Sequence, residues 1–224
     1  PIASSAASDV YKRQELEAAL IEHKPAILAM VHAETSTGVC QPMEGIGDLC
    51  RKHDCLLLLD TVTSLGGVPL YIDEWKVDLA YSCSQKGLSC PPGLGPFTMG
   101  PRAEAKMTAR QGKVPNWYLD VSLLNQYWGS DRVYHHTAPV NMNFGMREAL
   151  RLLAEEGLDQ AWARHRSNAE MLWNGLESLG LSMHVPAERR LPTLTTVRIP
   201  EGVDGKAFSQ HPVSYTHLTL PTRL

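Results

Sequence analysis

Short apolar runs alternate with stretches of helical periodicity in the first half of the chain. Residues 26–31 and 55–59 are continuous apolar runs of strand length, which is typical of strands buried on both faces of a sheet, and residues 77–82 predict a third strand. Helices are predicted over residues 15–22 and 42–53, where apolar residues recur at helical spacing. This alternation predicts an α/β fold with a mainly parallel sheet.

The second half of the chain has a different pattern. Residues 116–128 are rich in aromatic side chains and predict a loop, whereas residues 141–155 predict a helix that Gly157 interrupts. Residues 159–179 predict a long amphipathic helix, and residues 193–199 predict a strand. The expected apolar stripe of the long helix consists of Trp162, His165, Ala169, Leu172, Leu176 and Leu179.

Gly157 also marks the expected boundary between two domains. We expect residues 15–156 to form part of a large α/β domain and residues 157–210 to form part of a smaller α+β domain. Residues 1–14 are rich in Ser and Ala, and residues 211–224 are punctuated by Thr and Pro. Both ends are expected to be non-native flanks, and ordinary frayed termini are the alternative.

Composition and charge exclude several classes of protein. Of the 224 residues, 43% are hydrophobic and 20% are charged, which disfavours intrinsic disorder. No run approaches the ~18 apolar residues that span a bilayer. The net charge of -3 and the scattered Lys and Arg give no footprint for nucleic acid or for an anionic membrane. Five cysteines without a CxxC pair predict neither a disulfide framework nor a zinc site, and they favour a reducing, cytoplasmic compartment.

Asp60 is the first candidate for chemistry because it directly follows a predicted buried strand. Ligands of parallel α/β sheets bind at the carboxyl ends of the strands. A carboxylate at the mouth of a buried sheet needs a partner, since its desolvation is costly. The alternative is that Asp60 caps the turn of residues 61–64, a common position for Asp.

Lys86 is the second candidate, since it follows the next predicted strand and precedes the Gly/Pro-rich residues 87–95. A lysine in a partly desolvated pocket has a lowered pKa and can act as a nucleophilic amine that forms a Schiff base. An ordinary surface lysine in a loop is the alternative. The glycine-rich stretch lacks GxGxxG spacing and therefore predicts no dinucleotide site.

The adjacent histidines His135 and His136 raise the question of a metal site. Neighbouring residues do not share one helical face, and no carboxylate stands at ligand spacing beside them. No metal ligand is therefore predicted in this segment.

Asp60 and Lys86, at the ends of consecutive predicted strands, resemble a residue pair of pyridoxal-phosphate enzymes of the aspartate-aminotransferase fold (fold type I). The segments ETSTG (34–38), LLLLD (56–60), SQK (84–86) and YHHT (134–137) occur in this order. Together they resemble the alanine–glyoxylate/serine–pyruvate aminotransferase family, which belongs to class V. The resemblance covers about residues 15–210 and places the binding of pyridoxal 5'-phosphate (PLP) in the large domain.

The resemblance implies the reaction and the residues at its centre. The expected enzyme transfers an amino group from alanine or serine to glyoxylate or pyruvate. Lys86 is implied to form the Schiff base and to move the proton during transamination. Asp60 is implied to pair with the pyridine nitrogen, which keeps the ring able to accept electrons.

Further cofactor contacts are implied for five matching residues. Thr35 is implied to hydrogen-bond the cofactor, Val62 to pack against its ring, and Gln85 to bind the phosphate. Tyr134 and Thr137 are implied to reach the phosphate of the neighbouring subunit. The implied active unit is therefore a homodimer with shared sites.

The sequence departs from the family pattern in a few places. Thr35 stands where Ser is commoner, and Cys83 stands where Gly is commoner before the SQK triplet; both keep the chemistry. Segments matching the family's Gly-containing phosphate loop, its stacking aromatic ring and its substrate-binding arginine are not found. The chain is thus expected to be a fragment, for which peroxisomal or mitochondrial targeting also stays open.

Two other functions remain as alternatives. A PLP-dependent lyase of the cysteine-desulfurase type shares the fold, but such enzymes usually carry His before the lysine, where this chain has Gln85. The other alternative is an inactive truncated fragment that acts as a dimerisation module. The presence of Asp60, Gln85 and Lys86 together favours the transaminase.

Overall fold

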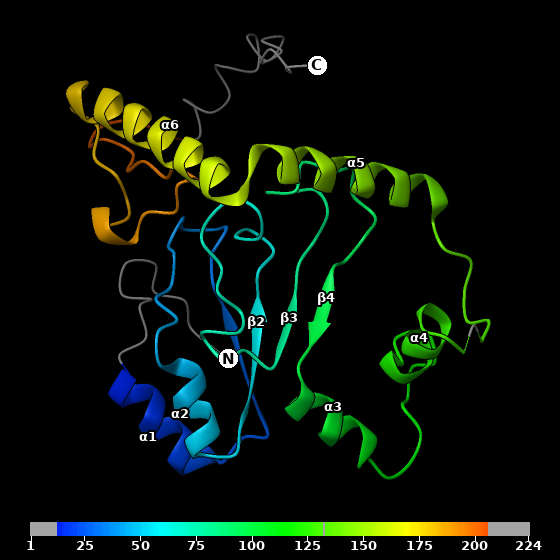
Figure 1. The fold of residues 1–224 in the computed structure, drawn as a ribbon. Helices are drawn as coiled ribbons and strands as arrows, with labels where there is room; N and C mark the ends of the chain where they lie inside the picture. The colour runs from blue at the N-terminus through cyan, green and yellow to red at the C-terminus, as the bar shows by residue number, and fades with distance from the viewer. Residues whose placement is uncertain (1–12, 132, 206–224) are drawn as a thin grey trace.

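The computed structural model describes residues 13–131 and 133–205 and shows a mixed α/β arrangement (Figure 1). The first half contains α1 (Arg13–His23), β1 (Ile27–Val31), α2 (Ile46–Lys52), β2 (Leu56–Asp60), β3 (Leu79–Tyr81) and β4 (Phe97–Met99). The second half contains α3 (Pro101–Thr108), α4 (Val121–Trp128), α5 (Val140–Glu156), α6 (Leu158–Ser178) and a short 3-10 helix (Ala187–Arg189).

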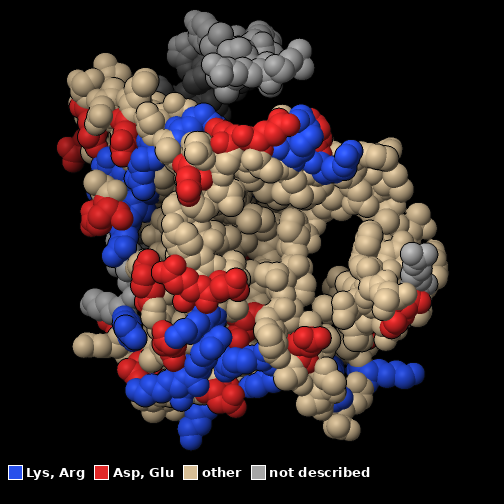
Figure 2. All heavy atoms as spheres, viewed as in Figure 1, with Lys and Arg blue, Asp and Glu red and all other residues tan. Residues whose placement is uncertain are grey.

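Charged side chains gather at two ends of the molecule. Figure 2 shows them along α5 and α6 and around the end formed by α1 and α2, whereas the hollowed face between these ends is largely uncharged. Exposed ion pairs such as Arg151–Glu148 (2.7 Å) lie on α5, where solvent leaves them little net effect on stability. Over the described ranges, none of the helices has both the length and the apolar character required to cross a bilayer.

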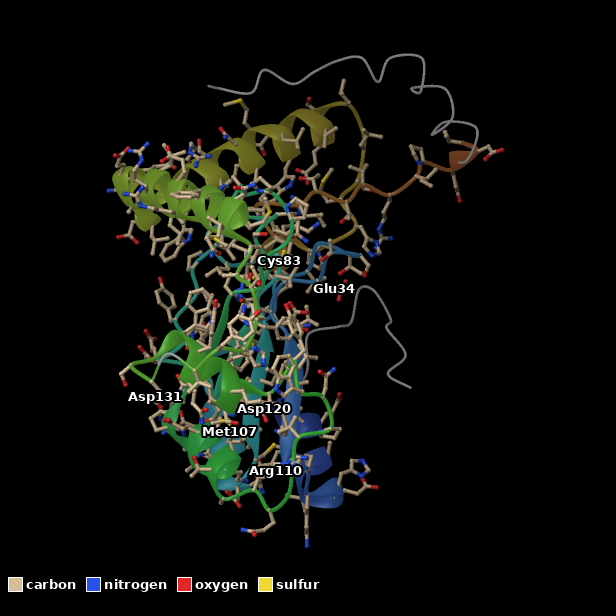
Figure 3. All side chains as sticks on the ribbon, turned by 90° about the vertical axis from the view of Figure 1, so that its right-hand side faces the viewer. Glu34, Cys83, Met107, Arg110, Asp120 and Asp131 are labelled. Atoms are coloured by element: carbon tan, nitrogen blue, oxygen red, sulfur yellow. The ribbon has the colours of Figure 1, made fainter. Side chains whose placement is uncertain are left out.

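The sheet confirms the predicted α/β fold. Its strand order is β1-β2-β3-β4, with β1, β2 and β3 parallel and β4 antiparallel to β3. The register aligns Val31 with Asp60 and Asp60 with Tyr81, so the first three strands end at the same edge. In Figure 3 the labelled Glu34 and Cys83, which follow β1 and β3, lie at this same end.

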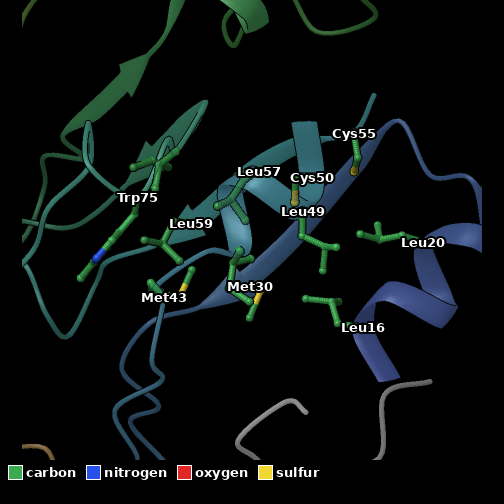
Figure 4. Close-up of a cluster of buried hydrophobic side chains, with 13 residues drawn as sticks. Leu16, Leu20, Met30, Met43, Leu49, Cys50, Cys55, Leu57, Leu59 and Trp75 are labelled. Atoms are coloured by element: carbon green, nitrogen blue, oxygen red, sulfur yellow. The ribbon is translucent and has the colours of Figure 1, made fainter. Parts of the chain in front are cut away.

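One face of the sheet packs against α1 and α2 to form the main core (Figure 4). Leu57 and Leu59 of β2 are fully buried there, and α1 contributes Leu16 and Leu20. These residues recur at the period of a strand and of a helix, respectively, which is why the sequence pattern located both elements. The core fixes the strands and therefore the positions at which they end.

The other face of the sheet is open along β1. Ile27 and Val31 are 49% and 37% exposed, and Phe97 of β4 is 48% exposed. The expectation that residues 26–31 are buried on both faces is therefore wrong for the described residues. The reason is that β1 is an outer strand of this sheet and carries helices on one face only.

Two other local predictions also differ from the structure, and two elements were not predicted. Residues 116–128 are not all loop, because α4 begins at Val121, where the Asp120 side chain accepts a 2.9 Å hydrogen bond from the N–H of Ser122. Residues 193–199 form no strand; Val197 makes only an isolated bridge with Met183. Strand β4 and helix α3 were not predicted, although Pro101 at the first position of α3 is a helix-start signal.

The long helix α6 is confirmed, but its predicted apolar stripe is partly wrong. Its buried residues are Ala161, Ala169 and Trp173, whereas Leu172 and Leu179 are 49% and 77% exposed. The indole of Trp173 donates a 2.9 Å hydrogen bond to Thr195, and this contact selects the buried face. Gly157 separates α5 from α6 with a positive φ of 86°, and the division into two domains at this point remains a prediction.

Candidate active site

Asp60 ends β2, and both of its carboxylate oxygens are hydrogen-bonded. Oδ1 accepts from the N–H of Val62 at 2.8 Å, and Oδ2 accepts from the phenol of Tyr81 at 2.6 Å. The first contact caps the turn that follows β2, as one of the two sequence interpretations proposed. The second comes from the neighbouring strand. Capping the turn and presenting a fixed carboxylate at the strand exit are therefore compatible.

The turn after β2 is held by its own backbone. The N–H groups of Ser64 and Leu65 both donate to the carbonyl of Thr61, at 3.2 and 3.0 Å. The Thr61 hydroxyl in turn donates to the carbonyl of Tyr81 at 2.8 Å. Val62 is half-buried in this turn, and the Cys83 thiol lies 4.0 Å from the Val62 carbonyl oxygen. The turn is thus attached to the chain that leaves β3.

Ser84 anchors the turn that carries Gln85 and Lys86. Its side chain is fully buried, donates to the carbonyl of Pro91 at 2.7 Å and accepts from the N–H of Leu94 at 3.3 Å. Gln85 and Lys86 themselves are exposed. A buried serine beside two exposed polar residues presents the amide and the amine toward solvent from a fixed backbone.

The turns after β2 and β3 are in direct backbone contact at a pair of glycines. A Cβ added to Gly87 would lie 2.3 Å from the carbonyl oxygen of Leu65, and one added to Gly66 would lie 3.0 Å from the carbonyl oxygen of Gly87. Side chains do not fit at these distances, so glycine is required at position 87. The contact places the Lys86 turn against the turn that Asp60 caps.

Thr35 lies in the loop after β1, and its hydroxyl oxygen is 2.8 Å from that of Thr63. The loop is ordered by Glu34, whose Oε1 accepts from the N–H and the hydroxyl of Ser36 at 2.8 and 2.7 Å. These two bonds lower the pKa of Glu34. Thr63, which sequence reasoning missed, is 7% exposed and belongs to the turn that follows Asp60.

His32, directly after β1, is a buried histidine close to these residues. Its Nε2 lies 3.6 Å from the Cys40 thiol, its ring packs edge-on against Trp75, and its Nδ1 has no hydrogen-bond partner among the described residues. Burial lowers the pKa of His32 to about 4 and raises that of Cys40 to about 11. The pair is therefore neutral near pH 7, which favours a structural role.

Tyr134 and Thr137 lie away from the strand exits. Their hydroxyl oxygens are 3.4 Å apart, and Tyr134 is 75% exposed. Figure 1 shows the segment between α4 and α5 on the far side of β4 from β2. The structure thus brings Thr35, Asp60, Val62, Gln85 and Lys86 to one end of the sheet, and it does not bring Tyr134 and Thr137 there within this chain.

A groove of about 1180 Å³ has residues from both parts of the chain in its lining. Its lining includes Leu65, Gly66 and Leu88 from the turns after β2 and β3, Trp128 from α4, and His136 from the segment between α4 and α5. His136 does not point to metal binding, because its Nδ1 lies 2.9 Å from Nδ1 of the buried His135. Over the described residues, no cluster of three or more His, Cys, Asp or Glu is arranged to hold a metal.

The arrangement at the strand exits combines an amine, a fixed carboxylate, an amide and a hydroxyl. The class-V aminotransferase family model matches residues 3–211 of the chain. The chain belongs to the class-V aminotransferase family. This finding confirms the family resemblance from which the site residues were selected.

Individual relatives of this chain carry related names. Alanine–glyoxylate aminotransferase of Oryctolagus cuniculus is 48% identical over 195 residues, which make up 85% of this chain and 50% of that protein. The (S)-ureidoglycine–glyoxylate transaminase of Bacillus subtilis is 38% identical over 202 residues, 82% of this chain and 49% of that protein. The chain spans about half the length of these curated relatives.

Solved structures support the same assignment. The crystal structure of an alanine–glyoxylate aminotransferase from Nostoc sp. superimposes with a TM-score of 0.90 at 62% identity, covering 92% of this chain and 55% of that one. A cysteine desulfurase from Thermococcus onnurineus NA1 superimposes with a TM-score of 0.71 at 15% identity and shares the fold alone. The chain therefore has the fold of type I PLP-dependent enzymes.

Proposed function

We propose that this chain carries the cofactor-binding core of a PLP-dependent transaminase that moves an amino group from alanine or serine to glyoxylate or pyruvate. The backbone contact between the Asp60-capped turn and the Lys86 turn, made at Gly87, carries the proposal. It places a carboxylate and an amine at the exits of neighbouring parallel strands, where α/β sheets bind ligands.

The residues at the strand exits fit PLP. Asp60 offers a carboxylate held in place by two donors, Val62 offers an apolar surface beside it, and Lys86 offers an exposed amine. Bound PLP supplies an aldehyde for the amine and a ring that accepts electrons from the substrate. Lys86 would hold the cofactor and carry the proton between donor and acceptor carbons. Thr35 would hydrogen-bond the cofactor, and Gln85 would bind its phosphate.

The proposed working unit is a homodimer in which Tyr134 and Thr137 contact the phosphate bound by the other subunit. Support comes from their neighbour His136, which lines the same groove as Leu88 of the Lys86 turn, and from exposed apolar side chains in the nearby segments of the chain. Trp117, Trp128 and Phe144 are 57%, 63% and 64% exposed. Exposed aromatic side chains are typical of a protein interface.

The substrate assignment rests on the names of the relatives. Alanine–glyoxylate and ureidoglycine–glyoxylate aminotransferases share glyoxylate as a named substrate, so glyoxylate is the first acceptor to test. Gln85, an amide, stands where desulfurases usually place a histidine, which favours transamination over lyase chemistry. The five free cysteines fit a reducing compartment such as the cytoplasm.

The activity test uses a full-length version of the protein with alanine and glyoxylate. Asp60→Asn keeps the shape of the side chain and removes its charge, and we expect a loss of turnover on the order of 10²- to 10⁴-fold, typical of one acid–base or electrostatic contribution. Asp54→Asn is the control, because Asp54 is 88% exposed and lies at the opposite ends of the strands. Equal activity in both variants would mean that Asp60 only caps the turn after β2.

Complementation tests the shared site. A Lys86→Ala subunit mixed with a Tyr134→Phe/Thr137→Ala subunit gives a heterodimer in which one site carries both defects and the other carries none. Activity is expected to reappear on mixing at low PLP concentration. If heterodimers form and mixing restores nothing, the two hydroxyls act within their own chain and the shared site is wrong.

A further inference from the structure

The loop after β1 and the turn after β2 are joined by one pair of side-chain hydroxyls. The oxygens of Thr35 and Thr63 lie 2.8 Å apart, although the two residues belong to separate strand exits. Thr63 is 7% exposed, whereas Thr35 is exposed. One residue of the pair is thus buried and the other is exposed at the strand exits.

The backbone on each side of this pair is already fixed. On the Thr63 side, the Asp60 carboxylate accepts from the N–H of Val62 at 2.8 Å. On the Thr35 side, the carbonyl of Glu34 accepts from the N–H of Gly38 at 2.8 Å, and the loop closes there with a positive φ of 79°. The remaining freedom at Thr35 is the rotation of its side chain and of its O–H bond.

A threonine hydroxyl carries one donor hydrogen and two acceptor lone pairs. When Thr63 occupies one of these positions, it leaves Thr35 with a defined set of directions for a second bond. Consecutive hydrogen bonds that share a hydroxyl polarise one another. A buried hydroxyl is also unfavourable without a partner, so Thr63 itself favours the conformation of Thr35 that satisfies it.

We propose that Thr63 is a positioning residue of the cofactor site, which orients the hydroxyl of Thr35 toward bound PLP and ties it to the turn that carries Asp60. This inference rests on the proposed function, because it takes Thr35 as a contact of PLP. Thr63 acts through Thr35 and makes no contact of its own with the cofactor.

Equilibrium binding of PLP to a full-length version of the protein tests the inference without any need for turnover. Thr63→Val keeps the branched shape and removes the hydroxyl, and we expect PLP to bind about 3- to 10-fold more weakly, the effect of one net hydrogen bond. Thr63→Ser restores a hydroxyl and should restore the affinity. Thr193→Val is the matched control, since the Thr193 hydroxyl is buried and has no hydrogen-bond partner among the described residues; its affinity should equal that of the wild type.

A double-mutant cycle separates positioning from a general structural effect. If Thr63 acts through Thr35, adding Thr63→Val to Thr35→Val should not weaken PLP binding further, so the two effects are strongly non-additive. If Thr63→Val weakens PLP binding as much in the Thr35→Val variant as in the wild type, the inference is overturned. It is also overturned if Thr63→Val alone binds PLP with wild-type affinity. A wild-type protein that does not bind PLP at all would instead overturn the proposed function.

Discussion

The phenol of Tyr81 donates a 2.6 Å hydrogen bond to Oδ2 of Asp60 from directly across the β2–β3 pair. This contact raises the pKa of Tyr81 to about 12, because the phenol would have to ionise beside a carboxylate to which it donates. The same bond fixes the direction of the Asp60 carboxylate. A strand residue that resembles ordinary sheet surface thus helps to build the site.

The Tyr81–Asp60 bond predicts a change in tyrosine titration. In Asp60→Asn the negative charge is lost, so the pKa of Tyr81 should fall from about 12 toward the ordinary value near 10. Ultraviolet absorbance of tyrosinate against pH, compared between the variant and the wild type, measures this shift. Asp54→Asn should leave the titration as it is. Identical curves for Asp60→Asn and the wild type would show that the two side chains do not interact in solution.

The glycine contact predicts opposite outcomes for two Gly→Ala substitutions. In Gly87→Ala the new Cβ meets the Leu65 carbonyl at 2.3 Å, so the two turns must move apart, at a cost of about 1–3 kcal/mol of folding free energy. PLP binding should weaken as well, because Lys86 moves away from Asp60. Gly175→Ala lies within α6 with nothing within 4 Å of the new Cβ and should stabilise by about 0.5–1 kcal/mol. Urea unfolding measures both, and a neutral Gly87→Ala would refute the close contact.

The sequence predicted Asp60 and Lys86 because each follows an apolar run, and periodicity locates where such a run ends. Tyr81 and Thr63 were missed because their contacts join different strand exits, which no local spacing reports. A partial signal for Tyr81 was present in the sequence. Tyr81 lies near the end of the predicted strand of residues 77–82, just as Asp60 lies directly after the predicted strand of residues 55–59. Strand β4 was missed because three residues after Gly95-Pro96 are too short for a periodic pattern.

Burial was the property that the sequence predicted least well. Residues 26–31 are as apolar as residues 55–59, but β1 lies at the side of the described sheet and β2 lies inside it. On α6, Trp173 is buried through its bond to Thr195, whereas Leu179 beyond the end of the helix is exposed. Neighbours that are distant in the sequence decide these cases, and hydrophobicity alone does not identify them.

Acid stability should depend on His32. Its pKa is lowered to about 4 by burial, whereas an unfolded-chain histidine titrates near 6.5. As the pH falls, His32 is therefore protonated in the unfolded state before it is protonated in the folded state. The free energy of unfolding should decrease by about 3 kcal/mol between about pH 6.5 and pH 4.

The variant His32→Phe should remove this part of the pH dependence. Glu44 faces His32 and partly favours its charged form, so the difference between variant and wild type is the quantity to measure, by urea unfolding between pH 4 and 7. His23→Phe, at an exposed position on α1, is the control. Parallel stability curves for wild type and His32→Phe would contradict the assignment.

A buried ion pair at the start of β3 should dominate the charge contribution to stability. Asp78 is 3% exposed and accepts from Arg102 at 2.8 Å and from the N–H of Leu57 at 2.9 Å. Arg102→Met leaves this carboxylate buried without its cation, and we expect a loss of about 3 kcal/mol. Arg151→Met on the exposed face of α5 should change stability by less than about 1 kcal/mol. Chemical unfolding measures the free energy of unfolding of both variants. Equal losses of stability in Arg102→Met and Arg151→Met would contradict this prediction.

Borohydride reduction in the presence of PLP, followed by peptide mapping, tests most directly whether this chain is the cofactor-binding core of a transaminase. The reduction fixes the cofactor on the amine that holds it. In a full-length version of the protein, we expect a pyridoxyl label on Lys86, none on Lys76 after β2, and no label at all in Lys86→Ala. A label on a different lysine, or PLP that binds and is never fixed to Lys86, would contradict the account.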